Sequence, residues 1–143
     1  MSKIKNIFDN KKKAWANGNG KALLLKTINI NDLVSEIISM NGVLSVDIFD
    51  WSGNVLYSYY RWGRSDNILE EKDLYELVTF VKKRLKKINQ KNLKHLIIRS
   101  DELNIITYST EKLIMIIHCD QKAKLPLLTI KAKRVTENIS ELV

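Results

Sequence analysis

The sequence predicts an α/β sandwich of the α+β class, with elements in the order helix, two strands, helix, three strands, helix. Three observations lead to this prediction. Residues 43–60 alternate between apolar and polar side chains on both sides of a tight turn, as a hairpin does. Residues 69–88 repeat Leu and Val at helical spacing. Residues 113–117 are apolar at every position, which indicates a central strand buried on both faces.

The first helix of this series is predicted to begin near Asn31. An Asn side chain can accept hydrogen bonds from the amides of a first helical turn, and Asp32 would lie at the positive end of the helix dipole. Gly42 is expected to end the helix. The residues that would face the core have one-sided helical spacing: Leu33, Val34, Ile37 and Ile38.

The hairpin that follows has two opposite faces. One face of its first strand would carry Leu44, Val46 and Ile48, and the other Ser45, Asp47 and Phe49. The turn between the strands has Asp50 at its start and Gly53 where a positive φ is expected. These positions favour a structural role for Asp50.

The long helix predicted over 69–88 has an apolar stripe made of Leu74, Leu77, Val78, Val81, Leu85 and Ile88. Tyr75 and Phe80 lie off this stripe, so the helix has more apolar surface than one sheet needs. Its acidic residues come first and its basic residues last, which complements the helix dipole. Strands follow at about 93–99, 103–109 and 113–119, and the last helix has Pro126 in its first turn.

Composition and charge narrow the function classes. The 143 residues suggest one domain, with a basic and partly flexible N-terminal extension at 1–30 and the folded domain at 31–143. The single Cys119 excludes an internal disulfide, and no signal peptide or membrane span is evident, so a cytoplasmic protein is expected.

The net charge is +8, concentrated in residues 1–26, 82–94 and 122–134. A charge of this sign favours acidic partners: a nucleic acid, an anionic membrane surface or an acidic protein surface. The basic N-terminus is the segment expected to meet a membrane or a nucleic acid. The alternative is a set of solvated faces without a partner.

No motif for catalysis or cofactor binding withstands examination. The GNGK of residues 18–21 has neither the earlier Gly nor the following Ser or Thr of a phosphate-binding loop. His118 and Cys119 are adjacent on a strand, so they point to opposite faces. Asp47 and Asp50 form a poor acid and base pair for the same reason. The sequence therefore predicts no enzyme, no cofactor and no metal site.

Aromatic and basic residues are interleaved between Tyr57 and Arg64, as in proteins that stack nucleic-acid bases. Trp62, Arg61 and Arg64 are the exposed candidates. Tyr57 and Tyr59 share one strand face and are equally compatible with the core. A nucleic-acid-binding module that uses the Lys-rich zones therefore stays open as the alternative function.

Three segments together resemble the Roadblock / dynein-light-chain family: the hairpin VLSVDIFDWSGNVLYS (43–58), the meander of residues 93–120 and the helix of residues 123–142. The resemblance covers about residues 31–142. It departs from the family at Pro126, where a Gly is common, and at the basic extension. It implies a profilin- or longin-like architecture: a five-stranded, largely antiparallel sheet with two helices on one face and one long helix on the other.

The resemblance also implies a function without catalytic residues. Family members form dimers through the middle helix and the next strand, and act as scaffolds, localisers or activating partners of small Ras-like GTPases. The implied homodimer interface is Leu74, Leu77, Phe80, Val81, Arg84, Leu96 and Ile98. Lys83, Arg84 and Lys87 are the residues expected to meet an acidic GTPase surface.

Overall fold

The computed structural model describes the main chain of residues 20–62, 69–90 and 92–143, with side chains from residue 29 onward. The predicted basic start of the chain lies largely outside the described residues, and so does Arg64. The contacts expected of that N-terminus, with a membrane or a nucleic acid, therefore stay predictions.

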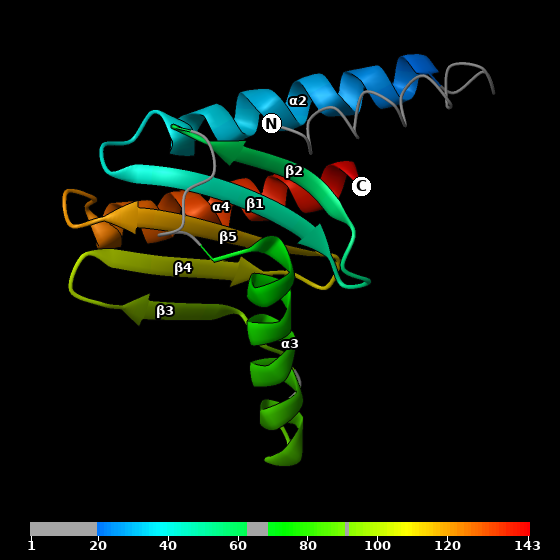
Figure 1. Cartoon of the computed structure of the whole chain (residues 1–143). Helices are drawn as coiled ribbons and strands as arrows, with labels where there is room; N and C mark the ends of the chain where they lie inside the picture. The colour runs from blue at the N-terminus through cyan, green and yellow to red at the C-terminus, as the bar shows by residue number, and fades with distance from the viewer. Residues whose placement is uncertain (1–19, 63–68, 91) are drawn as a thin grey trace.

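A single antiparallel sheet with strand order β2-β1-β5-β4-β3 forms the centre of the fold (Figure 1). The elements agree in type and order with the prediction. They are α2 (Gly20–Ile38), β1 (Val43–Asp50), β2 (Val55–Tyr60), α3 (Glu71–Lys87), β3 (His95–Arg99), β4 (Leu103–Ser109), β5 (Leu113–Asp120) and α4 (Leu125–Leu142).

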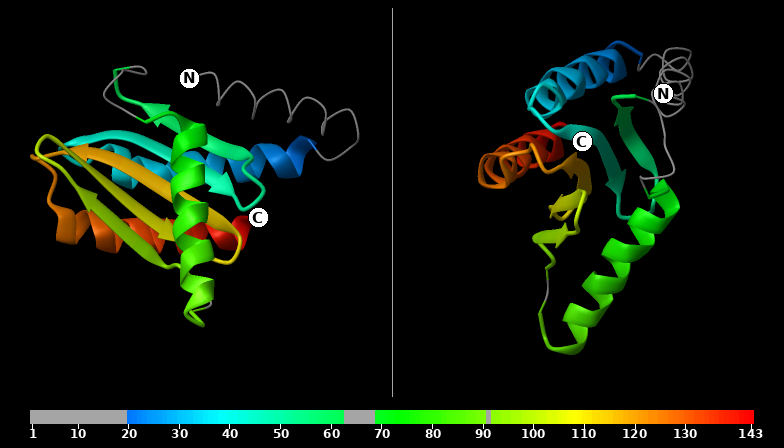
Figure 2. Two further views of the ribbon diagram at one scale, coloured as in Figure 1. Left: turned by 60° about the horizontal axis from the view of Figure 1, so that its bottom comes forward. Right: turned by 60° about the vertical axis from the view of Figure 1, so that its left-hand side comes forward.

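The helices cover the two faces of the sheet unequally. α2 and α4 lie side by side on one face, and α3 crosses the other face alone (Figure 2). The larger core lies under α2 and α4 and contains Val34, Ile37, Leu128 and Ile139. The smaller core lies under α3, where Leu74 and Val78 are its buried helical residues. This arrangement confirms the predicted layers.

The central strand β5 belongs to both cores. Every residue of 113–119 is buried, as its unbroken apolar run predicts. Met115, Ile117 and Cys119 face α2 and α4, whereas Ile114 and Ile116 face α3. β5 therefore requires a cover on both faces of the sheet.

The start of the first helix differs from the prediction. α2 begins at Gly20 and passes through Asn31, so Asn31 is not its cap. The apolar spacing continues N-terminally to Ile30, which is buried in the same core as Val34 and Ile37. Asn31 and Asp32 are exposed on the opposite side of the helix. An exposed polar pair inside a helix thus resembled a cap signal.

The end of α2 is stabilised by Arg61, which was expected to be exposed. Its guanidinium donates hydrogen bonds to the main-chain oxygens of Ile38 and Met40. The last carbonyl groups of a helix have no partner within the helix, and a cation is favourable there. Arg134 of α4 also pairs with Glu36 of α2. Arg61 is therefore a structural residue that connects β2 to α2.

The hairpin turn has the predicted construction. The Asp50 carboxylate accepts from the amides of Ser52 and Asn54, each at 2.9 Å, and from the Asn54 side chain. Gly53 has a φ of +89°. Separately, none of the helices described for this chain is long and apolar enough to cross a membrane.

Replacement of Gly42 by Ala should destabilise the fold more than the same change at Gly53. Both glycines have a φ near +90°, and this costs an L-residue about 1–2 kcal/mol. A Cβ at Gly42 would also lie 2.5 Å from the Ala123 nitrogen, whereas at Gly53 the nearest atom is 3.4 Å away, on Tyr75. Urea unfolding should show an extra loss of about 1–3 kcal/mol for Gly42→Ala. Equal losses of unfolding free energy in the two variants would contradict the role given to the close contact between Gly42 and Ala123.

Cys119 should not react with thiol reagents in the native protein. Burial, and then the nearby charge of Asp120, raises the pKa of its thiol to about 11. At pH 8 only about 0.1% of such a thiol is thiolate. We expect the native protein to react with a chromogenic disulfide reagent at least 100-fold more slowly than the protein in 8 M urea. Rapid stoichiometric reaction without urea would show that the core opens at β5.

Candidate interaction surface

The helix α3 has a wide apolar side, of which the sheet covers one part. Leu74 and Val78 are fully buried against the sheet, with Val81 and Leu85 partly buried beside them. One flank of the helix turns away from this contact. It consists of Leu77, which is half-buried, Phe80, which is 54% exposed, and Ile88, the residue directly after the helix, which is 64% exposed. We call Leu77, Phe80 and Ile88 the α3 flank.

The direction of α3 leaves this flank uncovered by the part of the chain that the structure describes. α3 crosses the strands, and its C-terminal end extends past β3, the last strand of the sheet (Figures 1 and 2). The helix therefore extends beyond the sheet that buries its first half. Apolar residues exposed together in this way mark an interaction surface more often than residues exposed singly.

The strand β3 forms an open edge of the sheet, at the end that α3 extends past. Among the described residues β3 pairs only with β4, so no described strand lies on its second side. Leu96 and Ile98 pack partly against the core under α3 and remain partly exposed. An edge strand has unpaired amide and carbonyl groups that a strand of another chain can bind. The α3 flank and the β3 edge, both on the α3 side of the sheet, together make up the candidate surface.

Most of the predicted interface residues lie on or near this surface. Phe80, Leu77 and Val81 of the prediction are on α3, Leu96 and Ile98 are on β3, and the Arg84 guanidinium lies 4.8 Å from the centre of the Phe80 ring. Leu74 differs, because it is fully buried within the chain itself. Lys83, Arg84 and Lys87, the predicted partner-binding residues, are exposed on the same half of α3.

The buried His and Cys of β5 do not form a catalytic pair. Cys119 lies in the core under α2 and α4, whereas His118 Nδ1 is 3.0 Å from Ser45 Oγ on the other face of the sheet. All three side chains are fully buried, so no substrate reaches them. Among the described residues, no group of three or more His, Cys, Asp and Glu could hold a metal ion.

A buried carboxylate network connects the hairpin to the start of α3. Asp47 accepts hydrogen bonds from Ser58 and from the Tyr60 hydroxyl, the latter at 3.0 Å, and the same hydroxyl is 3.1 Å from Glu71. Burial, followed by the charge of Asp47, raises the pKa of Tyr60. The alternation of β1 placed Asp47 on the same face as Phe49, but it did not indicate these partners. The network positions the N-terminal end of α3.

Aromatic residues fix the other side of α3. The Tyr75 hydroxyl donates to the Trp51 oxygen at 2.7 Å, and the Tyr75 ring packs near Phe49. Lys82 lies over the Trp51 ring, with its Nζ 3.6 Å from the ring centre. Burial, and then the neighbouring Lys86, lowers the pKa of Lys82. These contacts fix the rotation of α3, and hence the direction in which the α3 flank points.

Two of the basic zones meet at one pocket of about 360 Å³. Lys82 and Lys94 of the second zone line it together with Lys133 of the third. Glu111 and Glu137 line the same pocket, so its charge is mixed. The aromatic and basic segment after β2 contributes no such cluster among the described residues: Arg61 binds the end of α2, and Trp62 is 79% exposed.

No protein-family model matches the sequence, and no curated protein matches it significantly. Solved structures do match. The gliding protein MglB from Thermus thermophilus is 15% identical, with a TM-score of 0.66 over 79% of this chain and 87% of that chain. An MglB with a tetrameric arrangement is 15% identical, with a TM-score of 0.69 over 82% of this chain and 89% of that chain.

A third match names the fold directly. The Roadblock/LC7 domain from Streptomyces avermitilis is 9% identical, with a TM-score of 0.61 over 76% of this chain and 92% of that chain. Identities this low show a common fold and leave partners and activity undecided. The strand order, the helix on each face and these matches agree with the architecture that the hairpin, the meander and the last helix predicted. The chain therefore has the Roadblock-type fold.

Proposed function

We propose that this chain is a non-enzymatic Roadblock-type module that forms a homodimer, and that the dimer binds a small Ras-like GTPase in the cytoplasm and regulates or localises it. The observations that support self-association best are the exposed α3 flank and the open β3 edge. The tetrameric arrangement of an MglB with the same fold also supports it.

A second copy of the chain fits the surface for two physical reasons. In a twofold dimer, the part of α3 that extends past β3 could lie against the other copy, which would cover both α3 flanks. Pairing of the two β3 strands would remove both open edges at once. Burying the exposed part of Phe80 or Ile88 would contribute about 1 kcal/mol per side chain to the free energy of dimerisation. Each side chain occurs once in each copy, so each contribution is made twice.

The GTPase part of the proposal rests on the Roadblock resemblance and on charge. Lys83, Arg84 and Lys87 are exposed at the C-terminal end of α3, next to the apolar surface. Charges on the rim of an interface mainly accelerate association with a partner of opposite charge. A module without catalytic groups would act by binding and repositioning loops of the GTPase. The proposal therefore predicts that the affinity of the module for the GTPase depends on whether the GTPase holds GDP or GTP.

Substitution of Phe80 by Asp should separate the dimer. Each dimer would contain two buried carboxylates in place of two rings. We therefore expect the dissociation constant of the dimer to be at least about 100-fold higher than for the unaltered protein. Sedimentation equilibrium between 1 and 200 μM measures the mass. Ile130→Asp on α4 is the matched control, because Ile130 is also exposed and lies away from the surface. A monomeric unaltered protein at 200 μM, or an unchanged Phe80→Asp dimer, would refute the proposed interface.

Binding to a Ras-like GTPase should differ at least tenfold between its GDP form and a form with a non-hydrolysable GTP analogue. Biolayer interferometry with both forms of the Ras-like GTPases of the same genome measures this. The alternative function, nucleic-acid binding through the Lys-rich zones, predicts affinity for a 20-nucleotide DNA that falls steeply as salt rises. Tight, salt-sensitive DNA binding together with equal binding of both GTPase forms would favour the alternative.

A further inference from the structure

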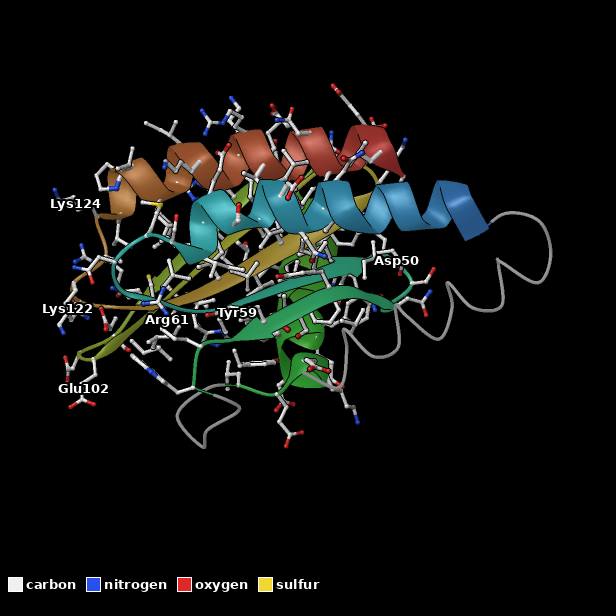
Figure 3. All side chains as sticks on the ribbon, turned by 90° about the horizontal axis from the view of Figure 1, so that it is seen from above. Asp50, Tyr59, Arg61, Glu102, Lys122 and Lys124 are labelled. Carbon is white, nitrogen blue, oxygen red and sulfur yellow. The ribbon has the colours of Figure 1, made fainter. Side chains whose placement is uncertain are left out.

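A second pocket lies where the start of α4 meets the β3–β4 end of the sheet. Its volume is about 530 Å³, and it is lined by Arg99, Asn104, Gln121, Ala123, Lys124, Leu125, Pro126 and Leu127. Arg99 and Lys124 are the charged residues of this lining, and both are basic. Lys124 stands at the start of α4, at the same end of the molecule as Lys122 and Glu102 (Figure 3). The pocket lining thus has a net positive charge.

The N-terminus of α4 provides uncompensated amide groups to this pocket. Lys124 is the N-cap and makes no side-chain capping hydrogen bond, and the first turn contains no acidic residue. The first bond of the helix runs from the Leu128 amide to the Lys124 oxygen at 2.9 Å. The amides of Leu125 and Leu127 precede it and therefore have no acceptor within the helix. Such a terminus favours an anion.

An independent observation comes from Asn104, which is one of the lining residues of the pocket. The residue is 1% exposed, and its Oδ1 atom has no hydrogen-bond partner among the residues that the structure describes. Buried polar atoms in folded proteins nearly always have a partner, so this carboxamide lacks the group that would satisfy it. It lies opposite Arg99 in the pairing of β3 with β4. A carboxamide offers one acceptor and two donor hydrogens.

The remaining polar side chain of the lining is already engaged. Gln121 Nε2 donates to the Ser100 oxygen at 3.0 Å, so it forms part of the wall. The acidic side chains at this end of the molecule are absent from the lining. The carboxylate of Asp120 accepts from the Lys122 amide at 2.9 Å, and Asp101 and Glu102 are exposed in the β3–β4 turn. An anion in the pocket would therefore meet donors and cations.

We propose that this pocket binds a small hydroxylated phosphate monoester. The phosphate group lies at the N-terminus of α4 and accepts from the amides of Leu125 and Leu127. Arg99 and Lys124 balance its two negative charges, and the Arg99 guanidinium suits two phosphate oxygens at once. A hydroxyl of the ester donates to Asn104 Oδ1. The pocket exceeds the size of a phosphate ion, and its apolar lining accommodates the carbon chain.

Titration of the full chain with glycerol 3-phosphate, inorganic phosphate and glycerol tests this proposal. Amide chemical shifts in ¹⁵N-labelled protein are followed at constant ionic strength. We expect saturable shifts at Leu125 and Leu127 with both anions, at least threefold tighter binding of the ester than of phosphate, and no shift with glycerol. Equal affinity for ester and phosphate would refute the ester part, and the absence of saturation by 20 mM would refute the site.

Variants of the lining residues show whether the site is the pocket itself. The double variant Arg99→Gln with Lys124→Gln should weaken binding of glycerol 3-phosphate at least tenfold. Lys122→Gln removes the same kind of charge nearby, outside the lining, and should change the affinity less than twofold. Asn104→Asp, checked for folding by circular dichroism, should weaken binding by adding a negative charge. If Lys122→Gln and the double variant lost the same affinity for glycerol 3-phosphate, the binding would depend on the overall charge and not on the pocket, and the proposal would be overturned.

Discussion

The fold depends on one constraint, the burial of β5 on both faces of the sheet. Residues 113–119 are apolar or small at nearly every position and have no solvent-facing side, so helices must cover both faces. On one face α2 and α4 together cover the larger core, and Arg134 pairs with Glu36 between them. On the other face α3 alone covers a smaller core. This inequality between the faces leaves apolar surface on the α3 side.

The position and rotation of α3 decide which apolar residues on that side of the sheet are exposed. Tyr60 and Glu71 hold the start of the helix to the hairpin, and Tyr75 holds its side to Trp51. With its rotation fixed, α3 buries Leu74 and Val78 and turns Phe80 outward. The polar and aromatic contacts around α3 therefore set the direction of the proposed interface, while hydrophobic burial supplies the energy for both the core and the partner contact.

The sequence predicted the helices and strands, which have strong local periods, and missed the side-chain roles that depend on distant contacts. The alternation of β1, the stripe of α3 and the apolar run of β5 were sufficient to place the core, because each period is local. The start of α2 was predicted wrongly, since Asn31 has the same chemistry in a cap and on an exposed helix face. The role of Arg61 depends on α2, a segment far away in the chain, and no local pattern indicates it. The partners of Asp47 were hidden for the same reason, although the position of Phe49 on the same face was a signal of burial.

Concentration-dependent hydrogen exchange tests the central claim most directly, because it observes the open edge itself. If β3 pairs with a second copy, the amides of His95–Arg99 on the open side should be protected at 200 μM and lose at least tenfold protection on dilution to 0.1 μM. β2 (Val55–Tyr60) is the edge strand at the other end of the sheet, and it should exchange at the same rate at both concentrations. Equal, concentration-independent exchange at β3 and β2 would contradict the account.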